Sequence, residues 1–162
     1  MKIINTPTPA PCPLLAQSTQ SFLFHYINDA MPFWGLVITS IGFSIPALLA
    51  FRNKRKRMGK ACSVLTCTSL LYHGTQHFLW KTIDLCYAHT MGAFYSTQSL
   101  VRWIQHRRPY DFIIVCGTAG SLFLFYTGSC NKELSIHEQN KFHMAFHVIS
   151  QYMLSLHALD TK

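Results

Sequence analysis

Long stretches without a charged residue are the feature that most restricts the fold of this chain. A helix of about 20 mostly apolar residues crosses the hydrocarbon core of a bilayer. Four segments lack Asp, Glu, Lys and Arg over 17 residues or more: 33–51, 61–80, 85–101 and 112–131. A fifth uncharged segment, 142–159, also contains several His and Gln residues. The sequence therefore predicts an all-α, multi-pass transmembrane helical bundle with about five spans.

The placement of the basic residues predicts the orientation of this bundle. Only 12% of the 162 residues are charged, whereas about a quarter are charged in soluble domains. Connection 52–60 holds six Lys or Arg, and connection 102–109 holds three. Because cytoplasmic loops of membrane proteins are enriched in Lys and Arg, both connections are predicted to be cytoplasmic. The N-terminus then lies outside and the C-terminus inside, and the net charge of +8 reflects topology, with no nucleic-acid partner expected.

The sequence predicts one folded domain preceded by an arm. Residues 1–20 are broken by prolines and too weakly apolar for a signal peptide, so we expect a flexible N-terminal arm. Residues 21–162 form a single transmembrane helical domain, in which 21–32 is a short interfacial helix and Pro46 kinks the first span. There is no Cys-x-x-Cys pair for a thiolate metal site. Cys12, Cys86 and Cys130 lie near the outer face, and the sequence leaves open whether two of them form a disulfide.

Histidines gather at the outer ends of two predicted spans. His73 and His77 end the second span, and His143 and His147 begin the fifth, so the orientation puts all four at the same depth. Two histidines at i and i+4 share one helix face and can share one metal ion. A third histidine from another helix completes the three-ligand pattern of catalytic zinc. Since ionisable groups inside membranes are rare and usually functional, these histidines are candidate ligands.

Two further polar residues accompany the histidines. Ser69 lies one helical turn before His73, and Asp84 follows His73 by eleven residues. Each has a structural alternative, because Ser69 can bond back to its own helix and Asp84 can cap the third span. His73 and His77 form a rival i, i+4 pair, and paired histidines on facing helices can also ligate haem iron.

The spacing of these residues resembles that of the CREST superfamily of membrane metal hydrolases. The pattern is S-x-x-x-H closing one helix, an Asp eleven residues after that His, and H-x-x-x-H opening the last helix. The superfamily includes alkaline ceramidases, adiponectin-type receptors and lipases that remodel glycosylphosphatidylinositol anchors. The N-outside orientation and the eleven-residue interval resemble the ceramidase branch, as does a histidine ten residues beyond the final pair. The matching residues here are Ser69, His73, Asp84, His143, His147 and His157.

The resemblance implies a function and a site. Zn²⁺ would be held by His73, His143 and His147, Asp84 would transfer the proton of the attacking water, and Ser69 would donate a hydrogen bond to the water or the oxyanion. The substrate would be the amide or ester of a membrane lipid, and a eukaryotic protein of this kind would reside in the endoplasmic reticulum or Golgi. His157 would lie in the second shell of the site.

The chain also departs from the family pattern. Members have seven spans, and this chain has room for two fewer between the Asp84 helix and the last one. The loss of two spans keeps the parity, so the last helix still enters from the same side, but the missing helices help to wall the lipid pocket in the family. The alternatives are therefore a non-catalytic metal- or haem-binding membrane protein, a receptor or a scaffold derived from the same fold. An oligomer is compatible with the sequence but is not indicated by it.

Overall fold

The computed structural model describes residues 34–160, which are helical throughout apart from short connections, with no strand in that range. This confirms the all-α class. The predicted arm 1–20 and interfacial helix 21–32 lie outside the described residues. The helices are α2 (Trp34–Ile41), α3 (Ser44–Arg52), α4 (Lys56–Thr75), α5 (Phe78–His106), α6 (Pro109–Leu124), the π-helix η1 (Phe125–Ser129) and α7 (Ile136–Leu159).

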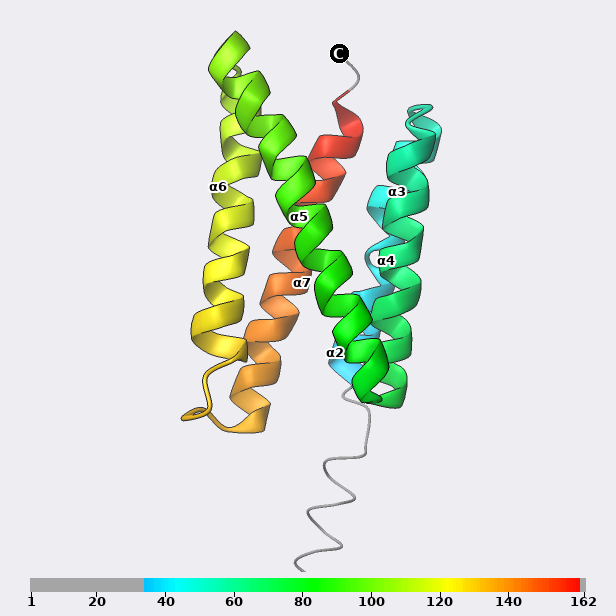
Figure 1. Ribbon diagram of the computed structural model, residues 1–162, viewed down its shortest axis with the longest axis vertical. Helices are drawn as coiled ribbons and strands as arrows, with labels where there is room; N and C mark the ends of the chain where they lie inside the picture. Colours follow the sequence, from blue (N-terminus) through cyan, green and yellow to red (C-terminus); the bar gives the residue numbers. More distant parts are fainter. Residues whose placement is uncertain (1–33, 161–162) are drawn as a thin grey trace, which may run out of the picture. The chain divides into compact units, whose positions relative to one another are not determined.

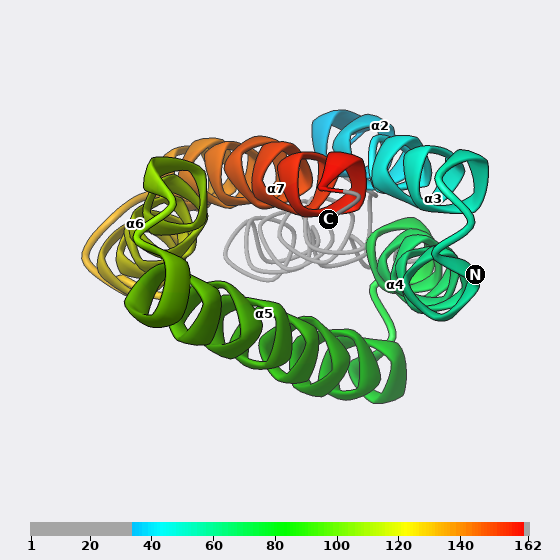
Figure 2. The same cartoon turned by 90° about the horizontal axis from the view of Figure 1, so that it is seen from above.

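The described helices run alternately up and down (Figure 1). Seen from one end they follow one another around a ring, with α4 between α3 and α5, and with α7 between α6 and the α2–α3 segment (Figure 2). The two basic connections, α3–α4 and α5–α6, lie at the end of the bundle where α7 finishes (Figure 1). Two contacts fix this arrangement: Asn53 donates to the carbonyl of Ala158 at 2.9 Å, and Arg108 donates to Asp160 at 2.7 Å.

Two helical segments among the described residues are long and apolar enough to cross a membrane, Trp34–Arg52 and Pro109–Ser129. They correspond to the first and fourth predicted spans. The helices that carry the other three predicted spans fall short of this apolar content, because α4 begins with several basic residues and because α5 and α7 contain many polar ones. By length and composition, the structure therefore supports two of the five predicted spans.

The first predicted span is interrupted before its proline. Helix α2 ends at Ile41, and α3 begins at Ser44 after a turn through Gly42 and Phe43. Pro46 thus lies in the first turn of α3, where backbone N–H groups have no partner within the helix. The N–H group that proline lacks therefore costs no helical hydrogen bond. The sequence predicts a kink at Pro46, and the structure has a break just upstream of it.

A capping box fixes the start of α7, which carries two of the candidate ligands. The Ser135 hydroxyl accepts a hydrogen bond from the Glu138 N–H at 3.3 Å, and the Glu138 carboxylate accepts from the Ser135 N–H at 3.0 Å. This reciprocal pair satisfies donors at the helix start that would otherwise have no partner. The Ser135 hydroxyl also donates to this carboxylate at 2.7 Å, and this bond, together with the one from the Ser135 N–H, holds the pKa of Glu138 below its usual value.

An ion-pair cluster fixes the opposite end of α7. Arg102 of α5 lies 2.8 Å from Asp111 of α6 and 3.0 Å from Asp160, just past α7. Arg108 pairs with the same two carboxylates, at 3.5 Å to Asp111 and 2.7 Å to Asp160. Asp111 is fully buried. The cluster joins three helices, whereas the sequence predicts only a topological role for these basic residues.

The cysteines of the described residues form no disulfide. Cys62 is buried, and Cys86 and Cys130 are both free thiols. The disulfide left open between Cys86 and Cys130 is therefore absent, while Cys12 lies outside the described residues.

Candidate metal centre

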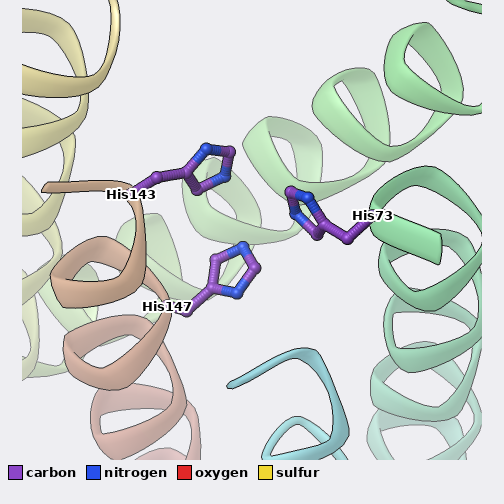
Figure 3. A group of neighbouring side chains, drawn as sticks. All are labelled: His73, His143 and His147. Atoms are coloured by element: carbon purple, nitrogen blue, oxygen red, sulfur yellow. The ribbon is translucent and has the colours of Figure 1, made fainter. Parts of the chain in front are cut away.

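His73, His143 and His147 come together from two helices. His73 projects from the last turns of α4, and His143 and His147 project from the second and third turns of α7, one turn apart on the same face (Figure 3). Their ring centroids are 4.8 to 5.1 Å apart. One nitrogen from each ring lies within 4.8 Å of the others. The three residues that the sequence nominates as ligands are therefore neighbours in the fold.

The geometry of the cluster fits a small ion. Three atoms no more than 4.8 Å apart all lie within about 2.8 Å of a common centre, against about 2.0–2.1 Å for a Zn–N bond. Side-chain adjustments of less than about 1 Å would therefore close the site on Zn²⁺. Three convergent imidazoles leave a fourth tetrahedral position open, as in catalytic zinc sites.

His73 provides the strongest sign that the cluster holds a ligand. Its side chain is 1% exposed, and neither ring nitrogen has a hydrogen-bond partner among the described residues. A buried polar atom without a partner costs about 1–3 kcal/mol. Coordination of an ion by one nitrogen would offset much of that cost. A histidine that served only in packing would have nothing to offset it.

Thr39 of α2 orients His147. The Thr39 hydroxyl donates to the carbonyl of Leu36 at 3.1 Å and lies 3.1 Å from Nδ1 of His147. Because the hydroxyl hydrogen is used on Leu36, Nδ1–H of His147 is the donor of the second bond. This tautomer leaves the lone pair of Nε2 free for a metal, which is the usual arrangement of a metal-ligating histidine. No motif in the sequence points to Thr39.

Aromatic rings enclose the other side of the cluster. Phe125, the first residue of η1, contacts the ring of His143 at a centroid distance of 5.4 Å. Phe146 contacts both His143 and His147, and Phe43 contacts His147 at 5.3 Å. The π-helix is thus located where α6 meets the candidate centre, and π-helical turns are frequent at functional sites.

Ser69 lies one helical turn before His73 on α4, Asp84 lies on α5, and both have partners of their own. Ser69 is 1% exposed, and its hydroxyl lies 3.0 Å from that of Ser40. Ser40 also donates to the carbonyl of Leu36 at 2.7 Å. Asp84 is 7% exposed and accepts a hydrogen bond from Thr68 at 2.9 Å. Asp84 is thus joined to α4 through Thr68, the neighbour of Ser69 in the sequence.

Two structural alternatives from the sequence are wrong. Asp84 does not cap α5, because the helix begins at Phe78 and its N-cap is His77, whose Nδ1 accepts from the N–H of Leu79 at 3.2 Å. His77 does not pair with His73, because α4 ends at Thr75 and Gln76 turns the chain with a φ of 54°. The i, i+4 relationship requires one continuous helix, and the turn removes it.

His157 is buried away from the three histidines. It follows His147 by ten residues, which is about 15 Å along α7. Its Nδ1 lies 3.1 Å from Arg102 and 3.2 Å from Ser99. It belongs to the end of the bundle that holds the ion-pair cluster, so the structure does not bring it into the second shell of the candidate centre.

Comparisons of the chain with protein-family models, characterised proteins and solved structures gave no match. Its function is therefore inferred from its own residues.

Proposed function

We propose that this chain is a multi-pass membrane protein that binds Zn²⁺ through His73, His143 and His147 and hydrolyses the amide or ester of a membrane lipid. The observation that carries the proposal is the convergence of these imidazoles, with neither nitrogen of buried His73 bonded to any residue of 34–160. A structural role explains neither the convergence nor the missing hydrogen bonds.

The distribution of polar and apolar side chains supports a membrane environment. Trp34, Ile38, Ile41, Ile45 and Leu48 form an outward stripe along α2 and α3 and are 52% to 68% exposed. Polar side chains are buried instead: Ser40, Thr68, Ser69, His73, Asp84, Ser99, Asp111, Ser121, His147 and His157. Large exposed apolar faces with polar interiors suit lipid better than water. Five helical passes with both basic connections at one end agree with the N-outside orientation.

The residues around the cluster suit hydrolysis. When bound, Zn²⁺ polarises a carbonyl and lowers the pKa of water to about 7. Asp84 accepts a proton in this scheme and passes it to the leaving nitrogen or oxygen. Ser69 donates a hydrogen bond to the oxyanion after its hydroxyl turns away from Ser40. Thr39 keeps His147 in the ligating tautomer.

An apolar wall supports a lipid substrate. Phe43 and Phe146 contact His147 on one side and line a cavity between α5, α6 and α7 on the other. A substrate hydrocarbon chain beside the candidate centre would contact these two aromatic rings. The alkaline ceramidases are the proposed nearest relatives. The endoplasmic reticulum or Golgi is the proposed location in a eukaryote.

A non-catalytic metal-binding protein, used as a receptor or scaffold, is the second candidate. It is favoured by the hydrogen bonds that Ser69 and Asp84 already make to Ser40 and Thr68, since neither side chain is free for chemistry. A haem protein is less well supported, because three nitrogens converge here and axial haem ligation uses two on opposite faces of the iron.

Lipid hydrolysis by the reconstituted full chain tests the proposal. Zinc-loaded protein in nanodiscs should release fatty acid from one member of a panel of ceramides, acyl esters and acylated glycolipids. The His147→Ala variant should be inactive, and His77→Ala, which removes a histidine outside the cluster, should keep wild-type activity. Zinc binding without turnover on any substrate would favour the non-catalytic alternative.

A further inference from the structure

The start of α4 and the second half of α5 border an open groove near the end of the bundle that carries the basic connections. The two helices meet where α4 ends and α5 begins, and they separate toward the opposite end (Figure 1, Figure 2). Residues 55–58 line one side of the groove, and Phe94, Tyr95 and Gln98 line the other. Its volume is about 360 Å³. The groove is distinct from the candidate metal centre, to which α4 contributes His73 near its other end.

The positive charges on one side of this groove have no carboxylate partner in the described part of the chain. Among those residues, the ion pairs of Lys and Arg side chains involve the two arginines of the ion-pair cluster, and not Lys56 or Arg57. Arg55 is held in place, because its guanidinium donates to the carbonyls of His157 and Asp160. Backbone carbonyls position a guanidinium without cancelling its charge. The groove therefore has three cations along one side.

The position of these charges is unfavourable for α4 itself. The first turn of a helix carries a partial positive charge and favours acidic residues. Lys56 and Arg57 are the first two residues of α4, the first turn contains no acidic residue, and the N-cap residue Arg55 makes no capping side-chain hydrogen bond. The sequence between Asp29 and Asp84 contains no Asp or Glu. An anion bound in the groove would supply the negative charge that this stretch of the chain lacks.

The rest of the groove suits a hydrocarbon chain. Met58 and Tyr95 are buried and provide an apolar inner surface, and Phe94 is 55% exposed at the edge. Phe94 lies about 6 Å farther from the cytoplasmic end of α5 than Gln98 does, because a helix rises 1.5 Å per residue. In the proposed orientation, the cations are therefore at the level of the lipid head groups, and Phe94 lies toward the midplane of the membrane.

We propose that this groove binds an anionic phospholipid of the cytoplasmic leaflet, whose phosphate lies against Lys56 and Arg57 and whose acyl chain lies against Phe94. Clusters of about four to eight Lys or Arg beside a membrane span are typical of binding to anionic lipids, and connection 52–60 holds six. Membrane topology accounts for a basic connection, but it requires neither a groove nor an aromatic wall. The proposal rests on the membrane placement proposed above and requires no zinc.

Native mass spectrometry of the full chain in detergent tests this site. The probes are dioleoyl phosphatidylglycerol and dioleoyl phosphatidylcholine, which carry the same chains and differ in head-group charge. One Lys or Arg near an anionic surface contributes about fivefold to binding, so Lys56→Gln/Arg57→Gln should lower the affinity for phosphatidylglycerol about 25-fold and change that for phosphatidylcholine little. The matched control, Lys54→Gln/Lys60→Gln, removes two charges from the same connection at positions that do not line the groove, and should have a much smaller effect.

A second pair of variants tests the apolar side of the groove. Phe94→Ala should weaken the binding of both lipids alike and leave the ratio of their affinities unchanged. Phe123→Ala removes a ring of α6 that is 66% exposed and lies outside the groove, so it should affect neither lipid. If the charge-removing double variant does not fold, Lys56→Gln and Arg57→Gln carry the same test singly, each with an expected loss of about fivefold.

Three results would overturn the proposal. Equal losses in the two double variants would show that a basic connection attracts anionic lipid without a groove. Equal affinity of the wild type for both lipids would remove the selectivity for charge. Displacement of phosphatidylglycerol by an equal concentration of glycerol 3-phosphate, which has a phosphate and no acyl chain, would assign the groove to a soluble anion. Zinc content and cysteine labelling report separately on the metal site and on the orientation.

Discussion

The hydroxyl of Thr39 lies 3.1 Å from Nδ1 of His147, although 108 residues separate the two in the sequence. The bond links α2 to the helix that supplies two of the candidate ligands. It also fixes which nitrogen of His147 carries the hydrogen, because the Thr39 hydroxyl donates to Leu36. Thr39, which is not itself a candidate ligand, thus sets the tautomer of the candidate ligand His147.

Replacing Thr39 should weaken metal binding without unfolding the protein. Loss of such a partner typically lowers metal affinity about 10–100-fold. Thr39→Val keeps the shape and removes the hydroxyl, so zinc affinity measured by competition with a chelator should fall within this range. Thr39→Ser restores the hydroxyl and should restore the affinity. Equal affinity in Val and Ser variants would mean that the bond has no influence on His147.

Asp84 should matter for turnover and not for metal retention. It lies outside the three-histidine group and accepts from Thr68. If it transfers the proton, Asp84→Asn should lower kcat on the lipid substrate by about 10²–10⁴-fold, with zinc content unchanged. The control is Thr68→Val, which removes its hydrogen-bond donor and should have a smaller effect. Loss of zinc in Asp84→Asn would assign the residue to the metal site itself.

Asp111 should contribute to stability through its ion pairs. Removing one partner of a fully buried pair costs about 3–5 kcal/mol. The side chains of Arg102 and Arg108 are 21% and 32% exposed, so we expect a smaller loss, on the order of 2 kcal/mol, for Asp111→Asn. Thermal melting in detergent should show a lower Tm. The exposed carboxylate of Glu133 provides the control, because Glu133→Gln should leave the Tm unchanged.

The orientation of the bundle can be tested by labelling. Lys54 lies in the connection between α3 and α4, and Lys132 lies in the connection before α7. In a chain whose exposed cysteines are replaced by serine, Lys132→Cys should react with a membrane-impermeant maleimide on sealed cells, and Lys54→Cys should react only after permeabilisation. The opposite pattern would reverse the proposed topology.

Much of the candidate centre follows from patterns that are local in sequence. The pair His143 and His147 depends only on helical spacing, and the sequence predicts that His73 joins them because the loop charges and the expected number of spans put both sites at one depth. The ligand set implied by the resemblance leaves His77 out, but the structural reason, the left-handed conformation of Gln76, was not predictable from the sequence. Uncharged segments show where a helix is apolar and not where it begins or ends. Helix α5 accordingly extends beyond the predicted segment 85–101 on both sides.

Contacts between distant segments account for the rest. Thr39 is one of several small polar residues in its segment, and nothing in its neighbourhood indicates His147. The interaction of Arg102 with Asp111 and Asp160 joins segments that are distant in the sequence. In the sequence alone, the basic residues of this loop indicate membrane topology, and nothing identifies their acidic partners. At the break, Gln151 of α7 donates to the carbonyl of Thr39 and lies against Gly42, whereas the sequence indicates only the nearby proline.

The central claim is that His73, His143 and His147 hold one zinc ion, and the most direct measurement is the zinc content of the full chain purified from membranes without chelators. The wild type and His77→Ala should contain about one zinc per chain, and His73→Ala and His143→Ala should contain almost none, with all four equally folded by circular dichroism. A wild-type protein without zinc that takes up none on titration would contradict the account.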